Sequence, residues 1–490
     1  MILNYFNRRQ TKQVFVLIAF GLLSGVTSNS MPNGVNQAVP DTVIPPSVII
    51  HNTPKSILKD PRVRMKFDKE QLVIDDGLQP SMIITRKGTL IVQSSMRHQT
   101  IFPSKRMVSA FPRGTVVSRD GAKTWKTIPL KPGENGLFME SDPIQLKDGT
   151  IIAIDTYVTP GTIDNQGLGQ LYTSNDDWKT LNGPEEITFN LPGVNFRGSS
   201  DDGGHPHDAA RLHRTILELP NGDLLATIYG WWQGDTTSAS YQTTMKKTRS
   251  VLLRSTNKGR HWEQVSTIAV DPQVGTEGFD EPTLVRLSKG PNVGRLICFM
   301  RTGQELYEAI SDDEGRTWTK PKPRIFADLD IRRTDLWIDM FRKIRDKNGK
   351  PLAEDPYQLV GAVVDPRLLE LRSGVLVAAF GVRVPPRANW RDPSHPWNGN
   401  YLAFSLDHGK SWSHVERLTS GVLTTHYMAI QEMPKDNLIF VAYDHGDFSV
   451  NRVHYTYGRL VQLTVDQKLM QSNAMNKRRV AESIHTVKAN

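Results

Sequence analysis

One eight-residue phrase recurs along the chain and predicts its fold, and its clearest copy is Ser118-Arg119-Asp120-Gly121-Ala122-Lys123-Thr124-Trp125. The phrase lies between two β-prone runs and has the composition of a tight hairpin. Its aspartate can accept hydrogen bonds from turn amides, its glycine favours a positive φ, and its tryptophan can pack between neighbouring sheets. The phrase returns at 311–318 and 405–412, with asparagine for aspartate at 255–262, and in shortened form at 174–178. Five such turns predict a protein built from repeated β-hairpins.

A second phrase, an apolar run followed by a turn and another apolar run, occurs six times, at 82–92, 144–152, 216–225, 284–297, 368–377 and 429–440. Six units of four short strands each predict an all-β, six-bladed β-propeller over residues 63–466. We expect a strand from near Val63 to Ile74 to cover the open edge of the last blade. Residues 31–62 are predicted to be a polar, proline-rich lead-in, and residues 467–490 a basic, flexible tail.

The N-terminus predicts export. A basic start precedes the apolar run 14–23, which is typical of a signal peptide over residues 1–30 and too short to span a bilayer. The only cysteine, Cys298, lies in the apolar stretch 296–300, so we expect a core residue and no intrachain disulfide. A large exported chain without disulfides suits a secreted or periplasmic protein of a bacterium.

The net charge of +9 is concentrated at the ends of the chain. Arg8, Arg9 and Lys12 supply +3, and the segment from residue 467 onward supplies +4, which leaves +2 for the body. A nearly neutral body does not favour a nucleic acid or another polyanion as the partner.

The eight-residue phrase is the Asp box, and the chain resembles the sialidase (neuraminidase) superfamily over roughly residues 63–465. In that family the boxes lie on outer hairpins away from the catalytic mouth. The resemblance therefore implies that the five boxes are structural. It also implies that catalytic groups lie where the first strand of each blade begins and the second strand ends.

Three residues match the family's catalytic groups. Glu281, in Phe279-Asp280-Glu281-Pro282-Thr283-Leu284, resembles the glutamate that activates the nucleophile. Arg301 resembles one of three arginines that hold the carboxylate of sialic acid, and Tyr427 stands at the position of the nucleophilic tyrosine. A further arginine could be Arg383, Arg387 or Arg391, among which the spacing does not decide.

Two features of the family are absent. The stretch Gly77–Ser81 aligns with the family's first arginine, and no Asp or Glu lies between Asp76 and Asp120, where the acid/base aspartate belongs. Arg97 and other basic residues occupy that loop, and we expect Arg97 to bind substrate. The missing arginine removes part of a carboxylate clamp, and the missing aspartate removes the acid for the leaving group. Asp142 or Asp208 would replace that acid.

Applied to every blade, the same positional rule predicts a polar ring around the mouth. Aromatic rings beside charged groups are typical of a sugar site. The remaining members of the ring are Glu140, Asp155, Tyr157, His205, His207, Arg211, His213, Tyr229, Trp231, Trp232, Asp235, Asp280, Asp365, Arg367, His426, Asp444 and His445.

Within the ring, His207 and Trp231 are the expected sugar contacts. His205-Pro206-His207-Asp208 could chelate a metal with His213, or its histidines could bond a sugar or act as a base. We expect no metal and no cofactor.

Three functions remain open. The first is a sialidase-like glycoside hydrolase acting on a non-standard or acidic sugar, with Tyr427 as nucleophile assisted by Glu281, or with Glu281 acting directly. The second is a polysaccharide lyase on uronate glycans, in which His207 or His426 with Tyr427 abstracts a proton. The third is a non-catalytic, glycan-binding propeller. The Glu281, Arg301 and Tyr427 trio favours an enzyme, and we expect a monomer whose partner is a glycan or oligosaccharide.

Overall fold

The computed structural model describes residues 54–75, 77–96, 113–128, 137, 139–196, 200–202, 205–207, 209–240, 245–329, 361–384, 397–420, 424–447 and 453–466. This part of the chain contains strands and no helix, so the predicted all-β class is confirmed. Consequently no helix in these ranges is long and apolar enough to cross a membrane. The predicted signal peptide and basic tail lie outside the described residues.

Four of the predicted units form separate sheets of consecutive strands. The first unit contains β4 (Gly77–Ile84), β5 (Leu90–Met96), β6 (Arg113–Ser118) and β7 (Lys126–Ile128). The fourth contains β19 (Asp280–Arg286), β20 (Leu296–Arg301), β21 (Leu306–Ser311) and β22 (Lys322–Arg324). The fifth contains β23 (Ala362–Glu370), β24 (Leu376–Arg383), β25 (Gly399–Ser405) and β26 (His414–Arg417). The sixth contains β27 (Met428–Glu432), β28 (Leu438–Asp447) and β29 (Val453–Val465).

The second and third predicted units are joined in one sheet of nine strands, so six separate blades are not seen. The nine strands are β8 (Ile144–Gln145), β9 (Ile151–Ile154), β10 (Tyr157–Pro160), β11 (Gln166–Ser174), β12 (Asn182–Asn190), β15 (Ala210–Glu218), β16 (Leu224–Gly230), β17 (Arg249–Ser255) and β18 (His261–Ala269). The long strand β12 pairs β18 in parallel, and β10 pairs both β11 and β15, which closes seven of the nine strands into a ring. A small hairpin of β13 (Ser200–Asp202) and β14 (His205–His207) lies apart.

Segments near the N-terminus complete two sheets. β2 (Val63–Phe67) and β3 (Gln71–Asp75) both pair β29, over the residues predicted to cover the last edge. β1 (Lys55–Leu58) pairs β26, so the predicted lead-in contributes a strand of its own. Unpaired edges invite association with other chains, and these additions cover two of them.

The five predicted turns share one set of hydrogen bonds. Ser118 Oγ donates to Asp120 Oδ1 at 2.8 Å and accepts the Ala122 N–H at 3.0 Å, while Asp120 Oδ1 accepts the Thr124 N–H at 3.0 Å. The same pattern recurs at Asp176, Asn257, Asp313 and Asp407. The asparagine copy and the shortened copy therefore form the same turn as the complete ones.

Apolar side chains fill the spaces between neighbouring sheets. Trp412, from the turn before β26, packs against Phe299 of β20 in the neighbouring sheet, at 5.7 Å between ring centroids. Trp125 lies 5.7 Å from Phe440 of β28 in the same way. Cys298, in β20, is buried and forms no disulfide. Contacts of this kind bury most of the apolar side chains.

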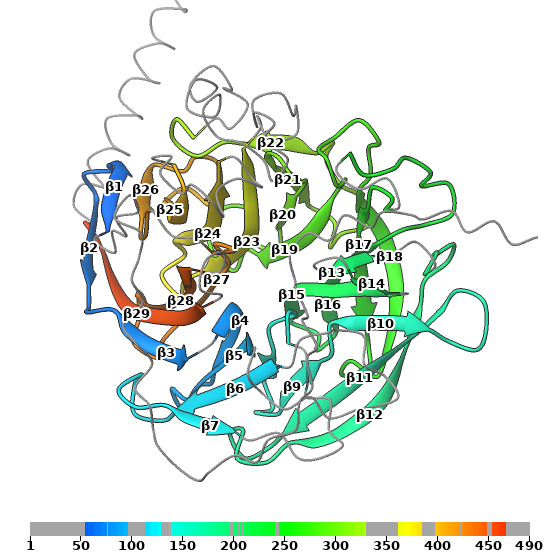
Figure 1. Ribbon diagram of the computed structural model, residues 1–490, viewed down its shortest axis with the longest axis horizontal. Helices are drawn as coiled ribbons and strands as arrows, with labels where there is room; N and C mark the ends of the chain where they lie inside the picture. The colour runs from blue at the N-terminus through cyan, green and yellow to red at the C-terminus, as the bar shows by residue number, and fades with distance from the viewer. Residues whose placement is uncertain are drawn as a thin grey trace, which may run out of the picture.

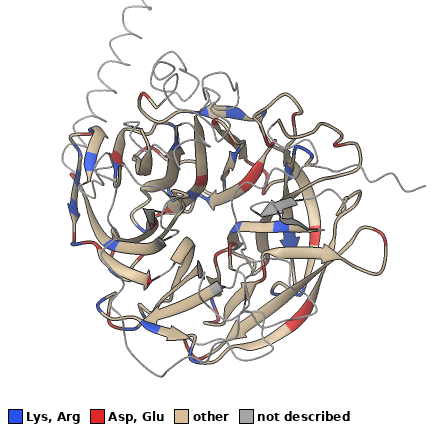
Figure 2. Ribbon diagram, viewed as in Figure 1, with Lys and Arg blue, Asp and Glu red and all other residues tan. Residues whose placement is uncertain are grey.

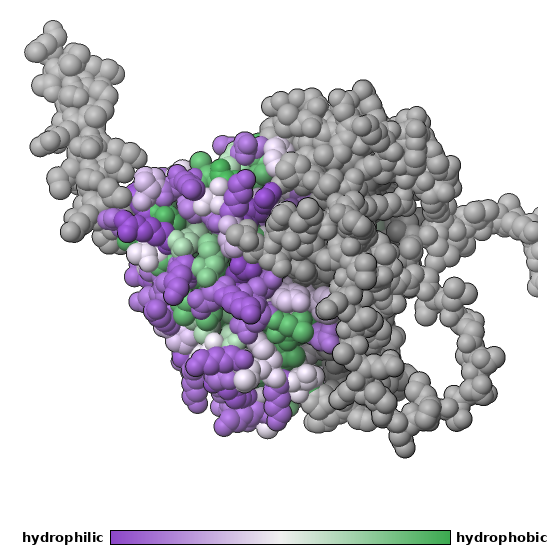
Figure 3. Space-filling model, turned by 60° about the vertical axis from the view of Figure 1, so that its left-hand side comes forward, coloured by the Kyte–Doolittle hydropathy of each residue, from purple (hydrophilic) through white to green (hydrophobic). Residues whose placement is uncertain are grey.

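The sheets are arranged in a ring, with β4, β15, β19, β23 and β27 nearest the centre (Figure 1). The inner strands β15, β19, β23, β27 and β4 contact one another in that order, apart from β4 and β15, which flank the second unit. Lys and Arg and Asp and Glu are both scattered around the ring (Figure 2). On the face seen in Figure 3, small groups of hydrophobic residues lie between hydrophilic ones. The centre of the ring is therefore the place where loops from several sheets meet.

Candidate active site

The inner strands share an irregularity that aims polar side chains at the centre. Four of them shift register near their beginning, at Leu78/Ser81, Leu212/Ile216, Asp280/Thr283 and Val364/Arg367. Non-glycine residues there or just before β27 have a positive φ, at Gln79 (58°), Arg214 (64°), Glu281 (41°), Asp365 (49°) and His426 (60°). Bulges redirect side chains, and strained backbone of this kind is concentrated at functional sites.

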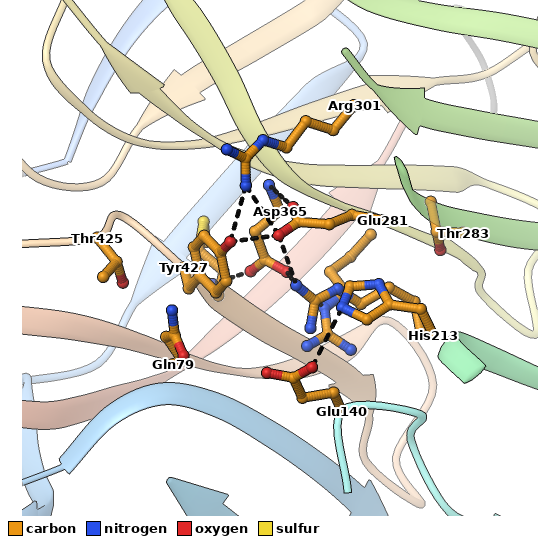
Figure 4. A network of polar contacts seen from close by, with 12 residues as sticks. Gln79, Glu140, His213, Glu281, Thr283, Arg301, Asp365, Thr425 and Tyr427 are labelled. Atoms are coloured by element: carbon orange, nitrogen blue, oxygen red, sulfur yellow. Dashed lines mark hydrogen bonds and ion pairs between the residues drawn. The ribbon is translucent and has the colours of Figure 1, made fainter. Parts of the chain in front are cut away.

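Three residues that the sequence grouped lie together at this centre (Figure 4). The Tyr427 hydroxyl donates a short hydrogen bond to Glu281 Oε1. Arg301 Nη1 donates to the same carboxylate oxygen and to the Tyr427 hydroxyl oxygen, both at 2.9 Å. Glu281 is the second residue of β19, Arg301 ends β20 and Tyr427 directly precedes β27, so the ends of antiparallel strands bring them to one place.

Burial and nearby charges fix the protonation states of Glu281 and Tyr427. Burial raises the pKa of Glu281, but Arg301 and Arg214 outweigh it and bring that pKa down to about 2. Burial and the Glu281 charge raise the pKa of Tyr427 well above its ordinary value. At neutral pH the phenol is therefore protonated and its partner is an anion, as a nucleophile and its base require.

A layer of buried polar groups, formed by Asp365 and Arg214, lies beside Glu281. The Asp365 N–H donates to Glu281 Oε2 at 3.0 Å, and the Asp365 carboxylate accepts the Met428 N–H. Arg214 Nη2 lies 2.6 Å from Asp365 Oδ1 and 3.8 Å from Glu281 Oε1. Burial and the nearby arginines together leave the pKa of Asp365 raised to about 6. This layer fixes the orientation of the glutamate.

The Tyr427 ring lies between two guanidinium groups. The Cζ atom of Arg214 is 5.2 Å from the ring centroid, and that of Arg383 is 5.6 Å away. Arg383 Nε donates to the Thr425 carbonyl at 2.9 Å. Cations over an aromatic face are attracted to it and stabilise negative charge that develops on the ring oxygen. Of the three arginines among which the spacing did not decide, Arg387 and Arg391 lie outside the described residues.

Arg367 reaches the strand where the family's first arginine is missing. Its Nη2 donates to the Pro80 carbonyl of β4 at 3.1 Å, and its Nη1 donates to Asp142 Oδ2 at 2.6 Å. Asp142 Oδ1 accepts the Met82 N–H at 3.2 Å. Burial raises the pKa of Asp142 despite the arginine. Asp142 is thus part of the cluster, with each of its oxygens already bonded.

The other predicted residues differ in their placement. Trp231 is buried, and its indole N–H donates to the Lys246 carbonyl at 2.6 Å, which places it in the packing beside the site. His426 is fully buried, and burial and Arg383 lower its pKa to about 3. The backbone of His207 lies in β14, while its side chain, Asp208 and Arg97 lie outside what the structure describes.

Sequence reasoning missed two members of the cluster, Arg214 and Glu277. Glu277 Oε1 accepts a hydrogen bond from Arg301 Nη2 at 3.0 Å. Arg214 directly follows His213 in β15. Strict alternation would point these two side chains to opposite faces of the sheet, and the bulge turns Arg214 toward the site. A search for charged residues within four positions of each matched residue would have found Glu277.

The described residues contain no group of three His, Cys, Asp or Glu side chains that could hold a metal ion. His213 faces Glu140 at 3.6 Å, and burial with Arg214 lowers its pKa well below the ordinary value. The side chains of residues 205–208, which the sequence offered as possible metal ligands, lie outside what the structure describes.

The fold and the site together define an all-β protein with a buried Tyr–Glu–Arg cluster where its inner strands meet. A protein of unknown function from Dyadobacter fermentans DSM 18053 is similar in structure, with a TM-score of 0.51 and 16% identity over 82% of this chain and 100% of that one. The K499G mutant of NanB sialidase from Streptococcus pneumoniae has a TM-score of 0.48 and 14% identity, covering 80% and 70%. The GH93 α-L-arabinofuranosidase of Fusarium graminearum has a TM-score of 0.48 and 13% identity, covering 80% and 97%. These similarities concern the fold alone. No family model matches the chain, and no curated protein matches it.

Proposed function

We propose that this protein is a sialidase-like glycoside hydrolase that works through a covalent intermediate on Tyr427. The observation that carries this proposal is the hydrogen bond from the Tyr427 hydroxyl to an ionised, buried Glu281, with Arg301 bonded to both. We further propose a six-bladed propeller, in which the sheet of nine strands represents two joined blades. The shared turn pattern supports the assignment of the five turns as Asp boxes.

The arrangement suits a two-step displacement. As the Tyr427 oxygen bonds the anomeric carbon, the C–O bond to the leaving group breaks and a general acid protonates the departing oxygen. The Tyr427 proton passes to Glu281, and the charge that develops on the tyrosine oxygen is stabilised by Arg301. Arg214 and Arg383 lie over the ring and add to that stabilisation. In the second step water gives a proton to the same acid/base group and bonds the anomeric carbon, the bond to Tyr427 breaks, and Glu281 returns the proton to the tyrosine oxygen.

The ion pairs made by the arginines of the site indicate which kind of sugar it binds. Arg301 is engaged by Glu277 and Glu281, while Arg214 bonds Asp365 and Arg367 bonds Asp142. A clamp for a sialic acid carboxylate presents arginines whose charge is available to the substrate. We therefore infer a sugar other than sialic acid. If the sugar is acidic, its carboxylate meets Arg301 or Arg383 together with residues such as Arg97.

The lyase alternative needs a histidine that reaches the substrate. His426, adjacent to Tyr427, is fully buried and does not reach a substrate, and the side chain of His207 lies outside what the structure describes. The burial of His426 favours hydrolysis over an elimination in which His426 is the base. The glycan-binding alternative shares the site and differs only in turnover.

The test is to incubate the purified chain with sialylated, neutral and uronate-containing glycans and to identify the products by mass spectrometry. A fragment that has gained water supports hydrolysis, and the released sugar identifies the substrate. An unsaturated uronate would establish the lyase instead. Retention of one glycan without any product would leave a binding protein.

We also propose that residues 1–30 direct export to the periplasm or the medium. Expression of the whole chain in a bacterium, followed by N-terminal sequencing of the exported protein, tests this. A mature N-terminus near residue 31 is expected. Accumulation of the intact chain in the cytoplasm would contradict the proposal.

A further inference from the structure

Three carboxylates surround one guanidinium group at the edge of the site. Arg301 Nη1 lies 2.9 Å from Glu281 Oε1, its Nη2 lies 3.0 Å from Glu277 Oε1, and its Nε lies 4.0 Å from Asp280 Oδ1. Arg214 lies 3.8 Å from Glu281 and helps to compensate that carboxylate, so Glu277 and Asp280 depend on Arg301 alone. In a partly desolvated place, carboxylates that crowd one guanidinium group repel each other. This crowding disfavours a further ionised carboxylate beside Arg301.

Glu281 is not the group that keeps the proton. It accepts hydrogen bonds from Tyr427, Arg301 and the Asp365 N–H, all of which favour the anion. The carboxyl group left to carry a proton is that of Asp280.

Glu277 and Asp280 form a pair with unused hydrogen-bonding atoms. Asp280 Oδ1 and Glu277 Oε2 are buried and accept no hydrogen bond from the residues that the structure describes. Burial, the Glu277 charge and a hydrogen bond with Glu277 raise the pKa of Asp280 well above its ordinary value. The other ionisable groups that face Asp280 are Glu281 on its own strand, Arg301 on β20 and Tyr229 on β16.

Asp280 and Glu277 are closer to solvent than the buried part of the cluster. The side chains of Arg301, Glu277 and Asp280 are 14%, 12% and 11% exposed, close to the 14% of Asp142, whereas Asp365 is fully buried and Glu281 is 5% exposed. A substrate enters from the solvent, so it can reach Asp280 or Asp142 and not Asp365. Exposure therefore leaves Asp280 and Asp142 as candidates for the acid.

We propose that Asp280 is the general acid for the leaving group, the role for which the chain has no carboxylate between Asp76 and Asp120. The inference rests on the proposed glycosidase function. In the first step the C–O bond to the leaving group breaks, the Asp280 proton passes to the departing oxygen, and the Tyr427 oxygen bonds the anomeric carbon. In the second step a water molecule loses a proton to Asp280 and bonds that carbon, and the bond to Tyr427 breaks.

Asp142 is the competing candidate. Each of its oxygens is bonded, one by Arg367 at 2.6 Å and the other by the Met82 N–H. Burial raises the pKa of Asp142, but both of its oxygens are occupied by these donors, whereas Asp280 Oδ1 accepts no hydrogen bond from the described residues and can face a leaving group.

The test compares two aryl glycosides of the sugar found with the glycan panel, one with dinitrophenol and one with unsubstituted phenol as leaving group. For Asp280→Asn we expect kcat/KM to fall about 10²- to 10⁴-fold with the phenyl glycoside and less than about tenfold with the dinitrophenyl glycoside, because the good leaving group needs no proton. Glu263→Gln, on the exposed face of β18, is the matched control and should behave as the wild type.

A second variant keeps the proposal testable if Asp280→Asn fails to fold. Glu277→Gln removes the anion beside Asp280, so the pKa of the acid falls and the alkaline limb of the kcat/KM profile moves to lower pH. Equal losses with both glycosides, or the leaving-group signature in Asp142→Asn instead, would overturn the proposal. A wild-type protein that hydrolyses no glycoside at all would instead refute the glycosidase function on which the proposal rests.

Discussion

Tyr427 and Glu281 lie 146 positions apart in the chain, yet the hydroxyl of the first donates its hydrogen bond to the carboxylate of the second. Glu281 lies in β19 and Tyr427 directly precedes β27 of another sheet, and the guanidinium group of Arg301, at the end of β20, bonds both. A protonated phenol against a buried anion is costly to maintain without a use.

Replacing Tyr427 by phenylalanine removes only the attacking oxygen. We expect kcat to fall at least about 10³-fold while the substrate still binds, because the ring remains between its two guanidinium groups. Steady-state kinetics and calorimetric titration with the substrate measure the two quantities. Tyr172→Phe, in β11, is the control that should leave both unchanged. Unaltered turnover would show that Tyr427 is not the nucleophile.

Replacing Glu281 by glutamine should change how stability depends on pH. The pKa of Glu281 is about 2 in the folded protein against an ordinary 4.5, so its stabilisation is complete above pH 4.5 and is lost as the pH falls toward 2. The stability deficit of Glu281→Gln should therefore narrow between pH 5 and pH 3 in urea unfolding. Wild-type and variant curves that stay parallel across this interval would contradict the low pKa.

Arg214 should act together with Asp365. Arg214→Met leaves a buried carboxylate without its closest cation, and we expect a loss of about 3–5 kcal/mol in the free energy of unfolding. Asp365→Asn in the same chain should recover part of this loss, since the charge that needed compensation is gone. A double-mutant cycle by urea unfolding measures the coupling. Strictly additive effects would mean that the 2.6 Å contact between them carries no energy.

The turn at Asp407 should matter for stability and not for chemistry. Its carboxylate accepts hydrogen bonds from Ser405 Oγ at 2.9 Å, from the Ser411 N–H at 2.8 Å and from Ser411 Oγ at 2.6 Å. Asp407→Ala should lower the free energy of unfolding by about 1–3 kcal/mol and leave kcat unchanged at a temperature where the variant is folded. Asp164→Ala, in an exposed loop, is the control. A selective loss of kcat would place this turn in the site after all.

The sequence predicted the repeated features well, because a turn depends on residues close together in the chain. All five turns form the same hydrogen bonds, including the one in which Asn257 replaces aspartate. The grouping of Glu281, Arg301 and Tyr427 came from resemblance combined with strand order, and the structure places these residues within hydrogen-bonding distance.

The sequence did not predict the bulges, and the errors at the site follow from them. Gln, Arg, Glu, Asp and His residues adopt the positive φ angles, and no glycine marks those positions. The rule that side chains alternate between the two faces of a strand therefore did not identify Arg214 as a residue of the site. The contact between Arg367 and the Pro80 carbonyl spans 287 positions and depends on how the ring closes. The joining of the second and third units likewise depends on the length of β12, which a turn motif does not specify.

The pairing of β2 and β3 with β29 has a consequence for the order of folding. Arg64 lies opposite Thr464 in that sheet, so the ring cannot close before nearly the whole described chain has been synthesised. The entropic cost of closing so large a loop grows only slowly with its length, but the search for the final partner is slow. Until then β29, the longest strand of the described chain, lacks both of its N-terminal partners and offers them a free edge. Newly made molecules are therefore most open to aggregation and proteolysis just before this last pairing.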